Sequence, residues 1–540
     1  MKTQQKQSQI YKLKGIDLSD EYAEGSFRGT LNISSRRYPY VTTRKGREKL
    51  DGYSNVSALS TWNNLIVVEG TDLKYGNTVV GQVSAVGSGG YLGRPKQFAV
   101  MNTKVVIFPD KKYLDLSNPS APTLKNMAVD LTITDSIAYT IPQLSDEFQR
   151  FTIAGGYETY KDLFGDLKKD DWVFVTADSE ENKLSFQKIE NNNGDLVIEF
   201  LKVGLTFSTT SYSTLRIERR IPDLDFICSS TNRLFGCVRE EQTIYASSFA
   251  DPDNFWDFSG ANTDNGQAQD SWAAQTGTEG FFTGCAKLGS SAVFFKEHSV
   301  TKILGTTPDD YRLYDYDIDG VKEGCYQSIL PINDALYFMS PNGVAVFGGN
   351  VTTVISHALG KKDYTDVVAG TDGERYIMSA KLGDEWRLIT FDLSRKMWLK
   401  EDNSHVESFV RYDNNLIMLI DGKLYKYDKG DFDGEWSIVF NPVHEANYNH
   451  YGQVTSSILE KKKYSKLIMR IEVNDYVQIE VRCDEGRWKE IDKIVNKKGV
   501  FTTAVPIDRC DTFEVKLSGR GEFTLMAIER IYHKGSERNE

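Results

Sequence analysis

The chain has 540 residues, a formal net charge of −12 and a pI near 5.3. This acidic balance argues against a protein that wraps nucleic acid, because binding to the phosphate backbone depends on Lys and Arg. It is compatible with a conduit, since an acidic wall repels phosphate and lets DNA pass. The 43 Gly, 13 Pro, 28 Tyr and 28 Phe favour many short strands joined by tight turns.

The sequence shows no pattern typical of a signal peptide, a membrane span or a disulfide framework. The N-terminal residues include lysines but no apolar segment behind them, and no apolar run is long enough to span a bilayer. We therefore expect a soluble protein that is not exported by a classical route. The six cysteines lack paired spacing and no His lies at ligand spacing from them, which predicts small buried thiols in a reducing cytoplasm: Cys228, Cys237, Cys285, Cys325, Cys483 and Cys510.

Residues 1–55 are polar with basic patches, at Arg36-Arg37 and at Arg44 to Arg47. One interpretation is a solvated N-terminal arm that runs along the fold. The other is an arm that docks on an acidic neighbouring protein or touches phosphate. We favour an arm that docks on protein.

A loose pattern then recurs: a polar Asn or Asp turn, a short apolar strand, a second turn and a second strand. The clearest stretch is 327–429, where Asn342-Gly343 and Asp421-Gly422 are strong hairpin signals because both turn positions favour positive φ. Seven copies are found, at residues 62–75, 102–116, 224–247, 288–304, 333–347, 376–398 and 414–427. Repeats that cannot bury their own faces stack on one another, which predicts a β-propeller of about six to eight blades.

The pattern is interrupted once and ends before the C-terminus. Residues 119–222 contain strands without the repeat, and a segment this long between blades predicts an inserted small β domain. Residues 433–540 alternate cleanly without the repeat and predict a separate antiparallel β-sandwich. The predicted domains are an arm (1–55), a propeller (56–118 and 223–432), the insert (119–222) and the sandwich (433–540). Residues 259–275 predict a polar loop, and residues 534–540 predict a frayed tail.

One segment resembles the first half of a calcium loop. Asp315, Asp317 and Asp319 alternate before Gly320, as in loops whose carboxylates converge where glycine turns the chain. The twelfth position is Tyr326 instead of a bidentate Glu. We therefore favour an acidic turn between blades, with calcium as the alternative and these three carboxylates as its candidate ligands.

No catalytic motif is present. The chain lacks a sialidase Asp-box, a nucleophile elbow, a Walker loop and a zinc-protease motif. We predict no enzyme activity, no catalytic residues and no cofactor site. Aromatic clusters at residues 255–258 and 281–282 could stack sugars, but the preferred interpretation is that they fill the space between blades.

Four stretches together resemble the propeller-type tail proteins of bacteriophages, similar in design to the nozzle of short-tailed phages. They are NLIVVEGTDLKYGNTVVGQV with KQFAVMNTKVVIFPDKKYLDL; ASSFADPDNFWDF; DALYFMSPNGVAVFGGNVTTVIS with FDLSRKMWLKED; and KKYSKLIMRIEV with PIDRCDTFEVKLSGRGEF. The motifs are distinctive as a series, and they span most of the chain apart from the insert.

The resemblance implies a structural protein of the virion, made in the host bacterial cytoplasm and assembled as a hexameric ring around the DNA exit channel. The insert or the C-terminal domain would contact the portal or adaptor ring and the fibre or tail-tip proteins, while viral DNA would pass without sequence-specific binding. Two alternatives remain open at this point. One is a host-surface or carbohydrate-binding protein, either receptor-binding or a glycan hydrolase. The other is a non-viral scaffold that uses the propeller for docking.

Overall fold

The computed structural model describes residues 5–10, 12–85, 96–143, 145–202, 206–258, 270–443 and 461–534. Over these residues the protein is nearly all β, with one four-residue helix, α1 (Tyr157–Tyr160), which confirms the predicted fold class. The chain forms two compact units. The first unit contains Met1–Asn55, Tyr337–Val346 and Thr353–Glu540, and the second contains Val56–Leu336 and Phe347–Thr352. Each is described by itself.

Four antiparallel four-stranded sheets belong to the second unit. In each, the order of the strands across the sheet is their order along the chain, as expected for propeller blades. They consist of β6 (Val56–Trp62), β7 (Asn64–Glu69), β8 (Asp72–Tyr75) and β9 (Thr78–Gln82); β10 (Gln97–Met101), β11 (Lys104–Phe108), β12 (Lys112–Asp115) and β13 (Thr123–Asn126); β20 (Phe226–Ser230), β21 (Arg233–Cys237), β22 (Thr243–Ala246) and β23 (Trp272–Gln275); and β24 (Phe282–Leu288), β25 (Ser291–Lys296), β26 (Val300–Leu304) and β27 (Arg312–Tyr316).

The remaining sheets of this type follow later in the chain. One consists of β28 (Leu330–Ile332), β29 (Ala335–Ser340), β30 (Gly343–Phe347) and β31 (Thr352–Val354), and the next of β32 (Tyr364–Thr371), β33 (Arg375–Leu382), β34 (Glu385–Asp392) and β35 (Met397–Asp402). The last contains β36 (Ser408–Tyr412), β37 (Asn415–Ile420) and β38 (Lys423–Lys426), completed by β5 (Glu48–Leu50) from the N-terminal region. The described residues thus hold seven four-stranded sheets, one for each predicted copy of the repeat.

The β5 strand gives the chain the connectivity of a closed propeller. It is the fourth strand of the last sheet, and residues 51–55 lead from it directly to β6, the first strand of the first sheet. The same step, from a fourth strand to the next first strand, joins β23 to β24 and β31 to β32. Closure of the seven sheets into one ring stays a prediction.

The polar turns of the repeat are two-residue hairpin turns. Thr231-Asn232 joins β20 to β21 and Asp413-Asn414 joins β36 to β37, and all four residues have φ between 47° and 56°. Positive φ at both positions is the mark of a type I′ turn, whose twist matches that of the strands. Asp421-Gly422 forms the same turn, as predicted. The hairpin predicted at Asn342-Gly343 also forms, but its turn lies one residue earlier, at Pro341-Asn342, because β29 ends at Ser340 and β30 begins at Gly343. The ring of Pro341 fixes φ near −65°, so this turn is not of type I′.

Successive sheets bury their apolar faces against each other. In the second unit, Val68 of β7 shares a core cluster with Val105 of β11, and Phe235 of β21 shares another with Phe294 of β25. In the first unit, Ile377 of β33 lies in one cluster with Met418 of β37. This stacking of neighbours is what the repeat predicts, since each sheet is too small to bury its own faces.

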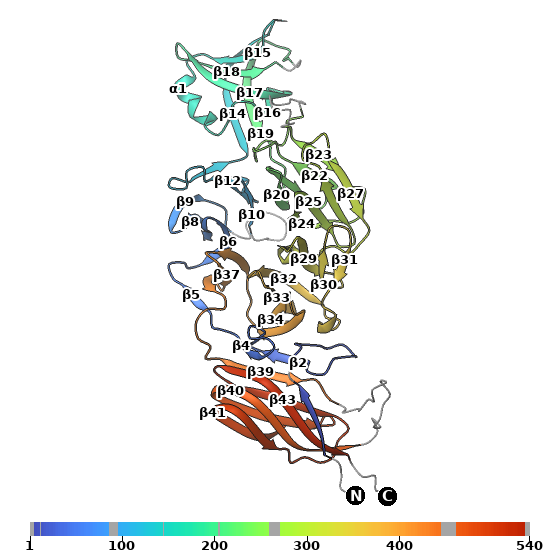
Figure 1. Ribbon diagram of the computed structural model, residues 1–540. Coiled ribbons are helices and arrows are strands. Elements are labelled where there is room, and N and C mark those ends of the chain that lie inside the picture. Colours follow the sequence, from blue (N-terminus) through green and yellow to red (C-terminus); the bar gives the residue numbers. More distant parts are fainter. Residues whose placement is uncertain are drawn as a thin grey trace. The chain divides into compact units, whose positions relative to one another are not determined.

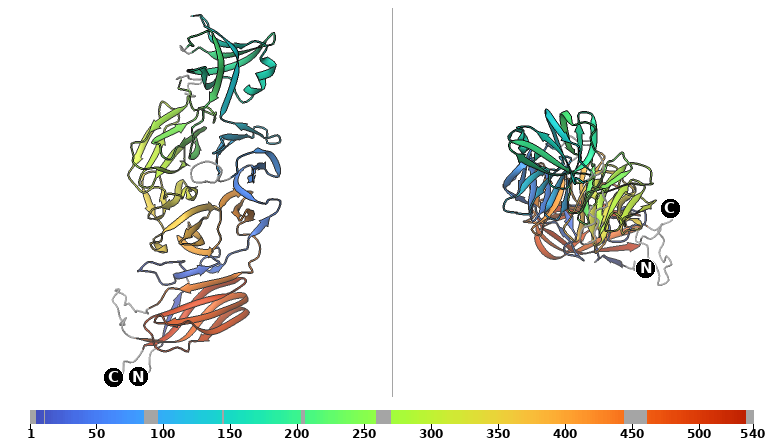
Figure 2. Two further views of the ribbon diagram at one scale, coloured as in Figure 1. Left: turned by 180° about the vertical axis from the view of Figure 1, so that it is seen from behind. Right: turned by 90° about the horizontal axis from the view of Figure 1, so that it is seen from above.

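The insert is a closed barrel of six strands with the order β14-β15-β18-β17-β16-β19 (Figure 2). The strands are β14 (Val129–Thr140), β15 (Phe148–Ile153), β16 (Asp171–Ala177), β17 (Glu180–Asn192), β18 (Asp195–Leu201) and β19 (Ser211–Arg219), with α1 and a 3-10 helix (Lys161–Phe164) between β15 and β16. The barrel has a core of its own, in which the Phe151 ring contacts the rings of Phe200 and Phe207 edge-on. The predicted boundary at residue 119 lies too early, because β13 still belongs to the preceding sheet.

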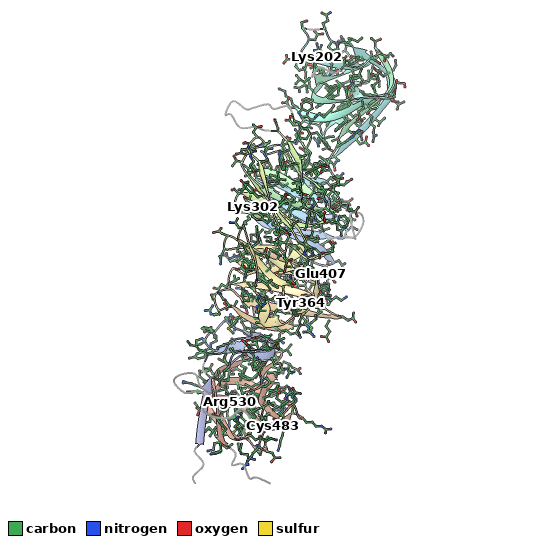
Figure 3. The ribbon with its side chains drawn as sticks, turned by 90° about the vertical axis from the view of Figure 1, so that its right-hand side faces the viewer. Lys202, Lys302, Tyr364, Glu407, Cys483 and Arg530 are labelled. Atoms are coloured by element: carbon green, nitrogen blue, oxygen red, sulfur yellow. The ribbon has the colours of Figure 1, made fainter. Side chains whose placement is uncertain are left out.

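The C-terminal strands form one nine-stranded antiparallel sheet together with N-terminal strands (Figure 1). Its members are β1 (Gln5–Ile10), β2 (Phe27–Leu31), β3 (Ile33–Ser34), β4 (Val41–Thr43), β39 (Glu435–Phe440), β40 (Lys462–Cys483), β41 (Lys489–Ala504), β42 (Phe513–Arg520) and β43 (Phe523–Lys534). The labelled Cys483 and Arg530 lie on β40 and β43 (Figure 3).

The long strand β40 divides this sheet into two arms. Its first half pairs with β43 and its second half with β42, while its pairing with β41 has a register shift between Val473 and Tyr476. The arms share a core, in which Trp436 stacks on Phe523 with ring centroids 3.9 Å apart. The prediction of a separate C-terminal domain is therefore corrected, because strands β1 to β4 of the N-terminal region complete this antiparallel sheet.

The described residues of the predicted arm, 5–10 and 12–55, are a folded part of the first unit and not a solvated arm. β2 pairs with β39, and β1 and β4 pair with β43. Phe27, Ile33 and Val41 are buried in the core of the nine-stranded sheet. The polar composition was misleading, because a few apolar residues at alternate positions are enough to anchor short strands on an existing sheet.

None of the six cysteines is in a disulfide over the described residues, and four of them are buried. Two predicted irregular segments fall partly on residues without a description. Residues 259–269 of the predicted polar loop and residues 535–540 of the predicted tail lie outside the described residues.

Candidate functional site

The predicted calcium ligands lie at the end of β27 but do not converge. Asp315 accepts a hydrogen bond of 2.6 Å from the Thr301 hydroxyl, whereas the Asp319 carboxylate lies 3.3 Å from Nδ1 of His298. Over the described residues, the one group of three metal-ligand types with converging atoms lies elsewhere, at Asp171, Asp251 and Asp253. The calcium alternative therefore has no support from the geometry. β27 runs to Tyr316, so Asp315 lies in an extended strand and not in a calcium-binding loop.

Gly320 has a packing explanation instead of a metal-binding one. A Cβ at this position would lie 2.2 Å from the carbonyl oxygen of Lys296 and 3.0 Å from that of Ser299. Its N–H donates to the carbonyl of Glu297 at 2.9 Å. The segment after β27 thus lies directly against the β25–β26 turn, and only glycine permits this approach.

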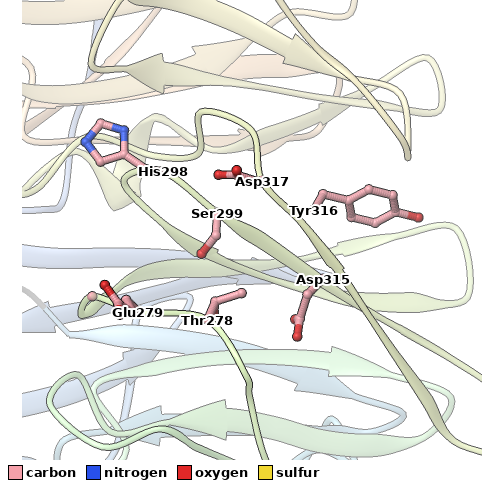
Figure 4. Close-up of a pocket in the computed structure, with 8 residues that line it drawn as sticks. Thr278, Glu279, His298, Ser299, Asp315, Tyr316 and Asp317 are labelled. Carbon is pink, nitrogen blue, oxygen red and sulfur yellow. The ribbon is translucent and has the colours of Figure 1, made fainter.

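Two of the three aspartates line a surface pocket of about 620 Å³ on the β24–β27 sheet. Its lining consists of the loop before β24, the β25–β26 turn and the end of β27: Thr278, Glu279, Gly280, His298, Ser299, Asp315, Tyr316 and Asp317. Figure 4 shows the Asp315 and Asp317 carboxylates at different places around the pocket, while the Tyr316 ring points away from it. Three carboxylates and no Lys or Arg line this space.

A buried lysine lies behind the pocket. The Lys296 ammonium donates to the Thr278 carbonyl at 2.6 Å, to the Thr276 hydroxyl at 3.2 Å and to Oε1 of Gln242. The side chain is buried, and burial lowers the pKa of Lys296. Its three donors are directed at protein acceptors, so its charge stabilises the loop that carries Thr278.

The converging carboxylates at Asp171, Asp251 and Asp253 form a second polar cluster, between the barrel and the neighbouring sheets. Asp171 begins β16, and the other two lie in the loop after β22. The Lys168 ammonium lies 2.7 Å from Asp253 and 2.9 Å from Asp251, and Arg219 pairs with Asp171 at 2.5 Å. These two cations neutralise the charge that a metal ion would otherwise neutralise, so we interpret the cluster as a structural ion network.

The carboxyls of Asp251 and Asp253 titrate as a pair because they are adjacent and buried. Burial and the neighbouring Asp251 raise the pKa of Asp253 to about 7, while Arg219 and Lys168 oppose this increase. The pKa of Asp251 lies at about 2, because its hydrogen bond with Asp253 and the Lys168 charge outweigh the effect of burial. The barrel is thus attached through a network of buried carboxyls and cations in which the pKa values of Asp251 and Asp253 are shifted in opposite directions.

The aromatic stretch 255–258 contacts the barrel, the β10–β13 sheet and the β20–β23 sheet. Phe255 is buried in the core between the β10–β13 and β20–β23 sheets, as the preferred interpretation predicted. Trp256 packs edge-on against Phe174 of the barrel, and its Nε1 donates to the Arg220 carbonyl at 2.7 Å. This stretch therefore fixes the barrel to the sheets.

The basic residues of the N-terminal region bind carboxylates of their own chain. Arg47 lies 2.7 Å from Asp402 and 3.4 Å from Glu401, and Arg36 lies 3.3 Å from Asp428. These pairs hold the segment that leads into β5 against the edge of β38. Docking of this patch on a neighbouring protein stays a prediction, while the structure shows acidic partners for these arginines within the chain itself.

Sequence reasoning missed Glu401, the centre of this network. Its side chain is 1% exposed and lies beside Arg44 and Arg47, and it accepts a hydrogen bond from the Tyr427 hydroxyl. Burial raises the pKa of Glu401, and the two arginines partly offset the increase. One feature of the sequence could have indicated Glu401. The basic N-terminal stretch needs acidic partners, and Glu401-Asp402 is a pair of carboxylates at the end of an apolar strand.

Comparisons with known proteins add little to this description. No protein-family model matches the chain, and no curated protein matches it. Similar solved structures include an exo-β-1,3-galactanase from Phanerochaete chrysosporium (10% identity, 55% of this chain and 92% of that chain, TM-score 0.21). Others are Hsv2 of Kluyvelomyces marxianus (11%, 44% and 86%, 0.23) and a mutant family 29 carbohydrate-binding module (15%, 23% and 74%, 0.13). TM-scores this low carry no argument about function.

Over the described residues, no helix has the length and hydropathy needed to cross a membrane.

Proposed function

We propose that this chain is a structural protein of a bacteriophage tail, the subunit of a nozzle-like ring that lines the DNA exit channel. The proposal includes no enzymatic role. The ring would be part of the virion, be assembled from chains made in the host cytoplasm, and dock the adaptor ring and the fibre or tail-tip proteins.

The observation that carries the proposal is the assignment of the four family-like stretches to the parts of the fold. The first and third stretches supply hairpins of the blade-like sheets, including β7–β9 and β29–β31. The second is the loop that fixes the barrel through Trp256. The fourth supplies β40 and β42 of the nine-stranded sheet. Each stretch is a weak motif by itself. Together they belong to three parts of the fold, which are the blade-like sheets, the loop that carries Trp256 and the nine-stranded sheet.

The charge balance agrees with this proposal. With a net charge of −12, the chain would repel the phosphates of passing DNA and would not bind them. The barrel is an exposed insert with its own core, so it is a suitable part for contact with a neighbouring ring or fibre.

The test is the mass of the purified chain in solution and in the presence of the particle from its own phage that lacks only this protein. We expect a ring near six times the 61.1 kDa chain, either alone or on the particle. Electron microscopy of the same sample would show a central opening. A chain that stays monomeric and never joins the particle contradicts the proposal, and binding to glycans in that case would favour the host-surface alternative.

A variant without residues 128–220 separates two roles within the proposal. If the barrel contacts the adaptor or the fibres, this variant forms the ring but no longer binds that partner. If it binds the partner as the full chain does, the nine-stranded sheet is the part that docks.

A further inference from the structure

The pocket on the β24–β27 sheet has carboxylates that the protein itself does not use. Over the described residues, Glu279 and Asp317 have no hydrogen-bond or ion-pair partner, whereas Asp315 is bound by Thr301. The nearby buried lysine, Lys296, directs its donors to the Thr278 carbonyl and two other neutral acceptors, and its charge acts on Asp315. Glu279 and Asp317 are therefore the two pocket carboxylates that no ion pair within the described residues compensates.

A buried hydroxyl in the same pocket also lacks a partner. Ser299 is 8% exposed, and its Oγ makes no hydrogen bond. Figure 4 shows this hydroxyl in the space between Glu279 and Asp315. A buried polar group without a partner is unfavourable, and a ligand that donates or accepts a hydrogen bond there would remove the deficit.

A metal ion does not fit this arrangement. The carboxyl oxygens of Glu279, Asp315 and Asp317 do not form a converging group of three over the described residues. A larger ligand with several spaced donors can reach groups that a single ion cannot. The volume of about 620 Å³ lies within the usual range for pockets that bind small molecules.

We propose that this pocket binds a small organic cation with a primary ammonium group. The ammonium would pair with Asp317, and a second, spaced donor of the same ligand would reach Glu279, since hydrogen bonds between charged partners are the strong ones. Ser299 would accept a further N–H or a ligand hydroxyl. Amino sugars and polyamines both present this chemistry. The inference concerns the pocket of one chain and does not depend on whether the chain forms a ring.

The test compares three probes by isothermal titration at low ionic strength. Spermidine carries charge without hydroxyls, a glucosamine trisaccharide carries both, and its N-acetylated form carries hydroxyls without charge. We expect the two cationic probes to bind and the neutral one not to. Tighter binding of spermidine then identifies the natural ligand as a polyamine, and tighter binding of the glucosamine trisaccharide identifies it as an amino sugar.

Three variants assign the binding to the pocket. Asp317→Asn should weaken binding about tenfold, equivalent to about 1.4 kcal/mol, and Ser299→Ala should weaken it about threefold. Asp309→Asn is the matched control, because it removes the same charge from an exposed residue between β26 and β27 that does not line the pocket. It should leave the affinity unchanged.

Ser299→Ala removes an unpartnered hydroxyl, so this variant should fold normally and keep the test informative. The proposal is overturned if no cationic probe binds at millimolar concentration or if the neutral trisaccharide binds as tightly as the charged one. Equal binding by wild type, Asp317→Asn and Ser299→Ala would also overturn it.

Discussion

A glycine after alternating aspartates has two physical explanations, and they predict different consequences when a methyl group is added. In a calcium loop the glycine turns the chain so that carboxylates converge on the ion. At Gly320 the constraint is the carbonyl of Lys296, which a Cβ would approach to 2.2 Å. Backbone cannot move aside as the end of a flexible side chain can, so the constraint is on packing.

We predict that Gly320→Ala destabilises the protein by about 1–3 kcal/mol, the usual cost of overpacking a closely packed site. Thermal unfolding with and without added calcium is the measurement, and the loss should be equal in both. Gly348→Ala is the control, because a Cβ there meets nothing within 4 Å and the residue is not left-handed. It should be neutral or slightly stabilising. A loss that appears only with calcium would restore the metal explanation.

At the scale of elements, the network around Glu401 explains how a short strand is retained on the last four-stranded sheet. β5 has only three residues and would contribute little by itself. The arginines before it, Arg44 and Arg47, reach Glu401 and Asp402 at the end of β35. Lys426 on β38 also pairs with Glu48 at 2.8 Å. Ion pairs before and within β5 therefore add to its backbone pairing with β38.

Glu401→Ala should destabilise this part of the protein by about 3–5 kcal/mol, because it leaves two arginines with reduced compensation in a buried site. Hydrogen exchange is expected to rise first in β5 and β38. Glu385→Ala provides the comparison, since Glu385 is 66% exposed and pairs with Arg387 at 3.4 Å. That change should cost at most about 1 kcal/mol. Equal protection of β5 in both variants would show that the network does not hold the strand.

The central hairpins of the sheets were predictable from sequence, and their edge strands were not. Central strands such as Leu65 to Val68 are apolar at every position, and all four of these side chains are buried. The edge strand β13 is mostly exposed and has no apolar alternation, so nothing in residues 123–126 signals a strand. The pocket was unpredictable for a related reason. It brings Glu279, Ser299 and Asp317 together from three separate segments, and only Asp317 belonged to a motif.

At the scale of the whole molecule, the barrel is the part most independent of the remaining chain. Its core is closed by its own six strands, and twenty buried residues form a cluster that contains no residue of the neighbouring sheets. Its attachment is local, through Trp256 and through the ions around Lys168 and Arg219. An insert with a complete core can fold without its host.

Residues 128–220 produced alone should therefore fold cooperatively, with dispersed amide signals in NMR and a single thermal transition. Asp171 and Arg219 stay paired within this segment, so excision leaves no unpaired buried charge between them. The chain lacking the same residues should keep the blade-like sheets. A disordered excised barrel would mean that the contact with Trp256 and the sheets is needed for folding.

The pairing of the first strand with the last has a mechanical consequence. Gln5 lies opposite His533 and Ile10 opposite Ile528, so β1 starts where β43 ends. Tension between the two ends of the chain would act along the hydrogen bonds of this pair and break them one after another, beginning at Gln5. Such peeling needs less force than sliding two strands past each other, where all bonds carry the load together. Under tension the chain would yield first at β1, and the longer pairing of β40 with β43 would be loaded only afterwards.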